Sequence, residues 1–493
     1  MVQKSISEEA FFEQAKFNTR RHFLKTCTSG LGAIAMSSIL GSCGQNKKQQ
    51  LIDENPFAVN PTPFNTKAKN IIFLHMEGAP SQLELFDYKP ELAKLDGQLC
   101  PQSLLEGKKF AFIKGTPKML GPQASFKQYG QSGAWFSDYF EHLNTMADEL
   151  TFLKAMHTDE FNHAPAQLFM HTGSARVGRP SMGSWITYGL GSENQNLPAY
   201  MVLVSGSEPS AGKYLWGNGF LPSVYQGVQC RSKGDPVLYI NNPSDIDSTI
   251  RRKSIEAINK INELTYSQVG DPETLTRISQ YEMAFRMQTE VPETMDINTE
   301  PAYIHEMYGI EPGKATFANN CLLARKLIEK GVRVVQLFDR RWDSHGTSAD
   351  SGVDIGLKKN VKYIDKALTA LINDLKQRGL LDETLIVWGG EFGRTPMMEN
   401  RAGDNDTVLK GRDHHVDAFT MFMAGAGVKK GYSHGETDEI GYYGIRGKTH
   451  IHDLQATILH LMGFNHEQFT YPFQGRNFRL TDTSGKVISE VLA

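Results

Sequence analysis

The sequence has few cysteines, and they are not arranged as a framework. Five occur in 493 residues: Cys27, Cys43, Cys100, Cys230 and Cys321. No two have the CxxC spacing of a metal or redox motif, which excludes a disulfide scaffold and a cysteine-bound cluster. A single disulfide among the last three stays open as an alternative.

Charge of one sign and long apolar runs are also scarce. The 52 basic and 55 acidic side chains leave a net charge of -3 without a Lys/Arg-rich run, so we expect no nucleic-acid partner. No Gly-rich dinucleotide fingerprint follows the first expected strand, which disfavours a redox enzyme. The hydrophobic content of 40% over this length is ample for a sizeable core.

The first 43 residues have the pattern of an export signal. Arg20 and Arg21 form a twin-arginine motif within residues 19–25 (TRRHFLK), and a short apolar stretch follows at 31–40. Leu40-Gly41-Ser42-Cys43 resembles the lipobox of bacterial lipoproteins. We therefore expect export by the twin-arginine route, a lipid anchor at Cys43, and a location in the periplasm or cell envelope. The polar residues 44–67 are typical of a tether.

The remaining chain alternates apolar strand-like runs with amphipathic helical patterns. The strand-like runs are residues 70–76, 150–156, 199–204, 332–338, 385–388 and 419–424. The clearest helices are predicted over 356–378, closed by Gly379, and over 314–330. This order predicts a single α/β domain over 68–493, with a mostly parallel central sheet and helices on both faces. A charged helical pair near 247–289 is predicted as an insertion.

Acidic, imidazole and guanidinium groups follow several of these strands. They occur in residues 74–81 (LHMEGAPS), 162–173, 339–346 (DRRWDSHG), 389–396 (GGEFGRTP) and 411–415 (GRDHH). Carboxyl ends of parallel strands meet at one edge of a sheet, where such groups can hold a divalent cation such as Zn, Ca or Mn. The predicted ligands are Asp343, His345, Glu391 and His415, with His414 or Glu77 next.

Several of these blocks resemble the sulfatase and alkaline phosphatase superfamily. Residues 382–393 (DETLIVWGGEFG) are similar to its metal-binding strand, which places Glu391 on a metal-binding Asp and Phe392 where the family has Asn or His. Residues 163–173 (HAPAQLFMHTG) are similar to the nucleophile block, with His163 at the nucleophile position. The first strand places Glu77 at the first metal Asp. Residues 453–459 resemble a helix near the end of sulfatases.

The chain as a whole resembles a bacterial family known as domain of unknown function 1501. The blocks that carry this resemblance are a twin-arginine leader, GAPSQLELFDYKP at 78–90, WDSHG at 342–346, GGEFGRTP and GRDHH. They occur in order and cover about residues 68–493. The resemblance implies the sulfatase-like fold and a candidate site, and it implies no substrate.

The predicted function is an exported, metal-dependent hydrolase of sulfate or phosphate esters, with an anionic ester or a polysaccharide as substrate. The alternative is a non-hydrolytic metal-binding or surface protein that keeps the fold. His163 is open between a metal ligand, a phosphohistidine-type nucleophile and a mark of lost chemistry, with Ser81 as a rival nucleophile. Arg394 and Arg412 are candidate clamps for the ester anion. His450 and His452 are weaker candidates for the same site.

Overall fold

The computed structural model describes residues 57–493, apart from 232–235, 238–240, 244, 402, 404, 406 and 407. The twin-arginine segment, Cys43 and most of the expected tether lie outside the described residues. The chain divides into two compact units, one with the described part of 239–289 and one with nearly all of the remaining described chain. In the part of the chain that the structure describes, we find no helix long and apolar enough to cross a bilayer.

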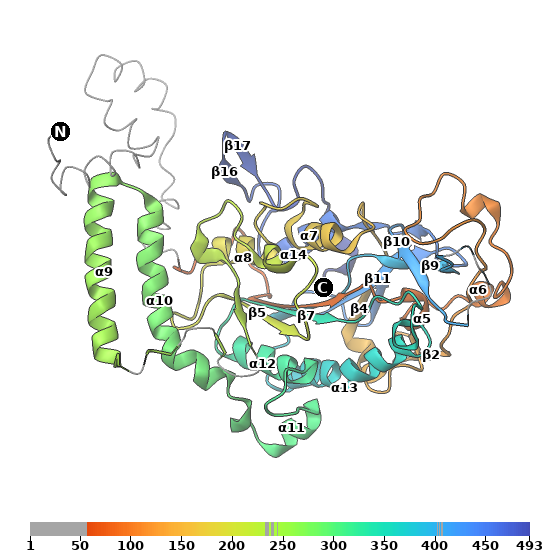
Figure 1. The fold of residues 1–493 in the computed structure, drawn as a ribbon, viewed down its shortest axis with the longest axis horizontal. Helices are drawn as coiled ribbons and strands as arrows, with labels where there is room; N and C mark the ends of the chain where they lie inside the picture. Colours follow the sequence, from red (N-terminus) through yellow and green to blue (C-terminus); the bar gives the residue numbers. More distant parts are fainter. Residues whose placement is uncertain are drawn as a thin grey trace, which may run out of the picture. The chain divides into compact units, whose positions relative to one another are not determined.

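A nine-stranded sheet forms the centre of the larger unit (Figure 1). Its order is β12-β4-β11-β8-β1-β7-β5-β6, and β15 also pairs with β4. Neighbouring strands run parallel except where β11 meets β4 and β8. The predicted α/β class with a mostly parallel sheet is confirmed. The strands are β1 Asn70–Glu77, β4 Leu150–His157, β5 Tyr200–Ser205, β6 Val228–Cys230, β7 Val334–Arg340, β8 Thr384–Gly389, β11 Phe419–Gly425, β12 Tyr432–His434 and β15 Thr449–His450.

Helices cover both faces of this sheet, which explains why its central strands are apolar without alternation. Every residue of β1 and β8 is buried, as expected for strands with both faces covered. Within the larger unit, α7, α8 and α14 lie on one face and α12 and α13 on the other (Figure 1). Their bounds are α7 His163–Thr172, α8 Met182–Leu190, α12 Phe317–Glu329, α13 Gly356–Gln377 and α14 Ile451–Leu461.

Local capping fixes where the two predicted helices begin and end. Helix α12 begins at Phe317 instead of Lys314 because the Thr316 hydroxyl accepts a hydrogen bond from the Asn319 backbone N–H. Helix α13 ends just before Gly379, whose φ of +70° suits glycine and closes the helix. The sequence pattern therefore placed both helices to within a turn.

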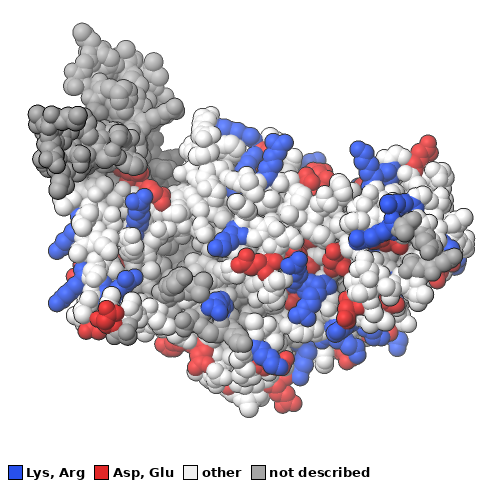
Figure 2. Space-filling model, viewed as in Figure 1, with Lys and Arg blue, Asp and Glu red and all other residues white. Residues whose placement is uncertain are grey.

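Shorter elements complete the larger unit. The two-stranded ribbons are β2 Phe126–Tyr129 with β3 Ala134–Ser137, β9 Gly393–Met398 with β10 Arg412–His415, β13 Glu436–Thr437 with β14 Gly444–Arg446, and β16 Tyr471–Phe473 with β17 Arg476–Phe478. The short helices are α5 Gln82–Leu85, α6 Pro90–Lys94 and α11 Ala302–Tyr308. On the face shown in Figure 2, acidic and basic side chains are interspersed.

The smaller unit contains a helical pair. Helix α9 spans Ser248–Val269, and α10 begins at Pro272 and ends at Met295. Arg252 of α9 donates a 2.9 Å hydrogen bond to Glu282 of α10, and Asn259 donates a second one to the same carboxylate. These polar contacts tie the two helices together.

A buried acid in β7 makes the stability of the fold depend on pH. Asp339 is 2% exposed, and burial raises the pKa of its carboxyl group to about 7. Between pH 4 and 7 the folded protein keeps a proton that the unfolded chain releases, so this group destabilises the fold as pH rises. We expect the free energy of unfolding of the wild-type protein to fall by about 2 kcal/mol between pH 5 and pH 8 because of this group, and we expect Asp339→Asn to lack this fall. Urea unfolding at both pH values measures this.

The asparagine side chain can still accept the hydrogen bond that Trp342 donates to the Asp339 carboxylate. Asp350→Asn is the matched control, because the Asp350 side chain is 77% exposed. An unchanged pH dependence in Asp339→Asn would show that Asp339 titrates normally in the folded protein.

Candidate metal centre

The polar groups predicted to meet do so at the carboxyl ends of neighbouring parallel strands. Glu77 is the last residue of β1, Asp343 follows β7, and Glu391 follows β8. His163 begins α7, and His414 lies in β10. Strands β7 and β8 flank β1 on either side, so three chain segments far apart in sequence deliver their side chains to one edge.

Three imidazole rings face one carboxylate oxygen at the heart of this cluster. The Oδ1 atom of Asp343 lies 2.7 Å from Nε2 of His345, 3.3 Å from Nε2 of His163 and 3.6 Å from Nε2 of His414. The Nε2 atoms of His345 and His414 are 3.1 Å apart. These four side chains can offer ligand atoms that all lie within 4.8 Å of one another. One carboxylate and three imidazoles are a typical donor set for a tetrahedral cation.

The other nitrogen of each ring is held by an oxygen atom. Nδ1 of His163 lies 2.7 Å from the Glu391 carboxylate, and Nδ1 of His414 lies 2.6 Å from the backbone carbonyl of Phe161. Nδ1 of His345 is hydrogen bonded to Glu399. Since carbonyl and carboxylate oxygens accept, each Nδ1 is the donor, and in a neutral ring Nε2 then carries the lone pair. This arrangement is typical of metal-binding histidines, whose second nitrogen is oriented by an oxygen.

The charges of the cluster favour a cation where the three Nε2 atoms meet. Burial lowers the pKa of His163, but hydrogen bonds and charges from Asp343 and Glu391 outweigh it and raise the pKa to about 9. A bound cation would take the place of the proton on Nε2. Burial raises the pKa of Asp343, but its histidine partners and Arg394 lower it far more, so Asp343 stays ionised. The residues present therefore fit a divalent cation.

A chain of buried polar contacts leads to Glu391. Tyr200 O–H donates to the Gln336 side-chain oxygen, and the Gln336 amide lies 2.9 Å from Nδ1 of His171. Nε2 of His171 lies 3.2 Å from Nδ1 of His75, and Nε2 of His75 lies 3.1 Å from the Glu391 carboxylate.

The direction of this chain follows from its amide end. The Gln336 amide can only donate, so His171 accepts on Nδ1 and must donate from Nε2 to His75, which in turn presents its own N–H to Glu391. Burial lowers the pKa of His171 well below its ordinary value, in keeping with a neutral ring. Burial raises the pKa of Glu391, but its contacts with His163 and His75 lower it by more, so Glu391 stays a carboxylate and holds His163 through Nδ1.

Gly78 allows the Asp343 loop to approach the end of β1. Its φ is +107°, and a Cβ atom there would lie 2.4 Å from the backbone nitrogen of Asp343. Its backbone N–H donates a 3.0 Å hydrogen bond to the Glu391 carboxylate. A side chain at this position would push the Asp343 loop away from the cluster.

Residues 68–492 match a family model described as protein of unknown function, DUF1501. The chain belongs to the DUF1501 family. A stretch of 127 residues is also 30% identical to the lipoteichoic acid synthase of Staphylococcus saprophyticus, and it covers 25% of this DUF1501 protein and 17% of the synthase. The match therefore spans far less than two thirds of that relative.

Two solved structures illustrate the distant structural likeness of this DUF1501 protein. The lipoteichoic acid synthase LtaP from Listeria monocytogenes is 11% identical, with 85% of this chain and 78% of that chain covered and a TM-score of 0.31. The alkaline phosphatase from the Antarctic bacterium TAB5 is 12% identical, with 81% and 99% covered and a TM-score of 0.28. Scores this low carry no argument about the site.

The structure brings only some of the sequence-predicted ligands of the DUF1501 protein together. Asp343, His345 and His414 meet, and His163 joins them. Glu391 lies outside this group of four side chains. Its carboxylate contacts His163 and His75 and does not reach the place where the Nε2 atoms meet. His415 is the next residue after His414, but along a strand its side chain points to the other face. Its Nε2 atom is bonded to the Tyr442 carbonyl.

The two predicted arginine clamps are fully buried in the fold. Arg394 donates to Asp343 at 2.6 Å and also to the backbone carbonyls of Gly78 and Ala79, so it orients the Asp343 carboxylate. Arg412 is paired with Glu84 at 2.5 Å. Because neither guanidinium group is exposed, we do not assign them to the substrate.

Three further candidates lie outside the cluster. The Ser81 hydroxyl donates a hydrogen bond to Glu84, the carboxylate that pairs with Arg412. Ser81 therefore supports this buried ion pair. His450 caps α14 and lies 3.3 Å from Asp159, and His452 contacts the Gly173 carbonyl. All three bonds hold loops or helix ends in place.

Sequence reasoning did not identify two outer partners of the cluster. Glu399 holds His345, and the Phe161 carbonyl holds His414. Glu399 lies just beyond the GGEFGRTP block, where its charge was the one available signal. A backbone carbonyl leaves no trace in the sequence, since every residue carries one.

Proposed function

We propose that this protein is a metal-dependent hydrolase of phosphate or sulfate esters with one divalent cation at His163, Asp343, His345 and His414. The observation that carries the proposal is the convergence of three Nε2 atoms on Asp343, with every Nδ1 held by an oxygen. Three nitrogen donors and one oxygen donor favour zinc, whereas calcium takes oxygen ligands. When bound, such a cation supplies Lewis-acid activation of the ester.

The chain's own residues position this chemistry. Arg394 holds the Asp343 carboxylate in one orientation. Glu391 holds the ring of His163 through Nδ1. Glu391 engages Nδ1, and Nε2 of His163 faces Asp343 at 3.3 Å in the middle of the cluster, so we assign His163 to the ligand set and not to nucleophilic attack. Water is then the attacking group of the proposed reaction.

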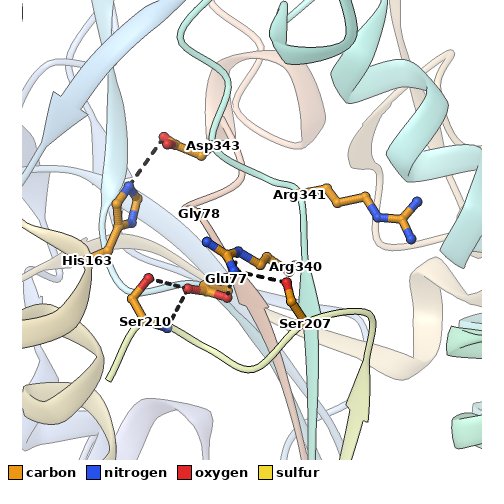
Figure 3. A pocket seen from close by; sticks show the side chains of 8 residues that line it. All are labelled: Glu77, Gly78, His163, Ser207, Ser210, Arg340, Arg341 and Asp343. Atoms are coloured by element: carbon orange, nitrogen blue, oxygen red, sulfur yellow. Dashed lines mark hydrogen bonds and ion pairs between the residues drawn. The ribbon is translucent and has the colours of Figure 1, made fainter. Parts of the chain in front are cut away.

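A cavity beside the cluster gives the ester a place to bind. Its volume is about 320 Å³, and it shares His163 and Asp343 with the proposed cation site (Figure 3). Asp343 lines this cavity, and 44% of its side chain is accessible to solvent. An ester anion entering here meets the edge of the cluster directly.

The proposal extends to the cell envelope through the N-terminal pattern. Arg20 and Arg21 with the lipobox at Cys43 support export and lipid anchoring. A substrate of an envelope enzyme would be an extracellular or periplasmic ester.

Metal analysis beside an ester panel tests the function. We expect about one zinc ion per chain, and turnover of at least one of an aryl phosphate, an aryl phosphodiester and an aryl sulfate. Removal of the metal with a chelator should reduce kcat/KM by more than about 100-fold, and added Zn²⁺ or Mn²⁺ should restore it.

Two results would count against the hydrolase. Turnover that survives complete metal removal contradicts the cation's role. Bound metal without turnover on any ester favours the alternative, a non-hydrolytic metal-binding protein. The alternative has one observation in its favour, which is that the imidazole of His163 stands where related enzymes are expected to carry a nucleophile.

A further inference from the structure

The cavity beside the metal centre has a second wall that the ester chemistry does not use. Its lining residues away from the cluster come from the ends of β1, β5 and β7 and the loop after β5 (Figure 3). They are Glu77, Gly78, Ser207, Ser210, Arg340 and Arg341. Figure 3 shows Arg340 pointing toward Glu77 and Ser207, whereas the Arg341 side chain extends away from them.

One oxygen of Glu77 is saturated by donors. Its Oε1 atom accepts from the Ser210 backbone N–H at 2.8 Å, from the Ser210 hydroxyl at 2.6 Å and from the Gln167 amide at 3.1 Å. The residue is 3% exposed. These bonds fix the carboxylate in a single orientation, and Glu77 is among the residues that line the cavity.

The other oxygen of Glu77 lacks a donor. Among the described residues, Oε2 has no hydrogen-bond partner, and the nearest cation is Nε of Arg340 at 3.6 Å. A buried acceptor without a donor is unfavourable. A ligand group that donates a hydrogen bond would recover this energy, so Oε2 is a preformed binding point.

Charge decides which kind of ligand fits. At Oε2 itself an anionic group is repelled by the carboxylate of Glu77, although Arg340 and Arg341 line the same wall, so we assign the ester anion to the cation site. An ammonium group is disfavoured by the guanidinium of Arg340, which donates to the Ser207 hydroxyl at 2.9 Å. A second metal ion is disfavoured as well, because no described cluster of three potential metal ligands includes Glu77.

A neutral hydroxyl group satisfies both neighbours, since it donates to Oε2 of Glu77 and accepts from Arg340 or Ser207. We propose that this wall binds a hydroxyl-bearing alcohol part of the ester, a polyol or a single sugar ring. This inference rests on the proposed function and names its substrate class. The cavity volume of about 320 Å³ sets the size of that part, at the small end of ligand sites.

Matched esters that differ only in hydroxyl groups test the inference. Glycerol 1-phosphate and n-propyl phosphate form one pair, and the corresponding sulfates form another. We expect the metal-loaded protein to prefer the hydroxylated member by at least about 10-fold in kcat/KM, because a site built for a hydroxyl discriminates against its absence. Calorimetric binding of the same pairs gives a readout that does not require turnover.

Glu77→Gln should abolish the preference. The glutamine oxygen would take over the three donors that Oε1 holds now, so its NH₂ group would face the cavity and could not accept a proton from a hydroxyl. We expect the ratio within each pair to fall to about 1. Glu436→Gln is the matched control, since Glu436 is 54% exposed. Arg340→Gln, a half-exposed position, should reduce the same ratio if Glu77→Gln fails to fold.

The outcomes separate the two proposals. Turnover or binding without a preference in the wild-type protein overturns the polyol site and leaves the hydrolase intact. A preference that survives both Glu77→Gln and Arg340→Gln overturns it as well. A hydroxyl preference in binding, without turnover of any ester, supports the site while the hydrolase fails. Loss of metal in Glu77→Gln shows that Glu77 is a ligand and contradicts the inference.

Discussion

Asp343→Ala is expected to lower the affinity for Zn²⁺ by more than about 100-fold. Changing an outer partner of a metal ligand already lowers metal affinity about 10–100-fold. Asp343 is closer to the proposed cation than such a partner, because all three imidazole rings face its Oδ1 atom. The variant keeps three neutral donors but loses the negative charge that offsets the cation. Competition with a chromophoric chelator measures the affinity directly.

Thermal unfolding gives a second reading of the same change. Saturating Zn²⁺ should raise the Tm of the wild-type protein, because a ligand that binds only the folded state stabilises it in proportion to the logarithm of its concentration over Kd. In Asp343→Ala this rise should nearly vanish. Asp350→Ala, at an exposed position, should behave as the wild type. A zinc affinity within about 3-fold of wild type in Asp343→Ala would place the cation elsewhere.

Arg412→Met is expected to lower the free energy of unfolding by about 3–5 kcal/mol. The guanidinium group of Arg412 meets the Glu84 carboxylate at 2.5 Å and 3.0 Å, and both side chains are fully buried. It also donates to the carbonyls of Thr395 and Gly121. Removing the arginine leaves Glu84 as an unpaired buried charge, which is the source of the penalty. Denaturant titration measures it.

A double variant distinguishes this structural role from a role in substrate binding. Glu84→Leu with Arg412→Met removes both charges, so much of the lost stability should return. If Arg412→Met instead folds with a loss below about 1 kcal/mol and loses turnover at unchanged zinc affinity, Arg412 clamps the ester anion, as the sequence suggested.

The candidate site was predicted better in its residue types than in its roles. Asp343, His345 and His414 were selected because acid and imidazole groups follow strands that share one edge. Glu391 was selected as a ligand for the same reason, yet the ring of His163 stands between it and Asp343. The sequence could not show that His163 lies between Glu391 and Asp343, because this depends on distances of a few ångströms.

Arg394 and Arg412 illustrate a second reason why the roles of site residues could not be predicted from the sequence. A guanidinium group near a candidate site fits a phosphate or sulfate as well as it fits a carboxylate or a carbonyl. Which partner it has depends on burial. Arg394 donates to the Arg412 carbonyl of β10 and to the Gly78 carbonyl just after β1, and Arg412 donates to the Thr395 carbonyl of β9. Glu399 and the Phe161 carbonyl were missed because no local pattern marks a residue as the partner of a distant histidine.

The sequence by itself determined six of the nine strands of the sheet, together with helices α12 and α13. Uninterrupted apolar runs need cover on both faces, and glycine and threonine stop and start helices locally. It also determined the family and the residue types at the strand ends. Only the tertiary structure decided which imidazoles share Asp343, which carboxylates orient them, and that Glu77 lines a cavity with one oxygen that has no donor. Local propensity acts over a few residues, whereas a binding site is built from contacts between segments hundreds of residues apart, and those contacts exist only once the sheet has formed.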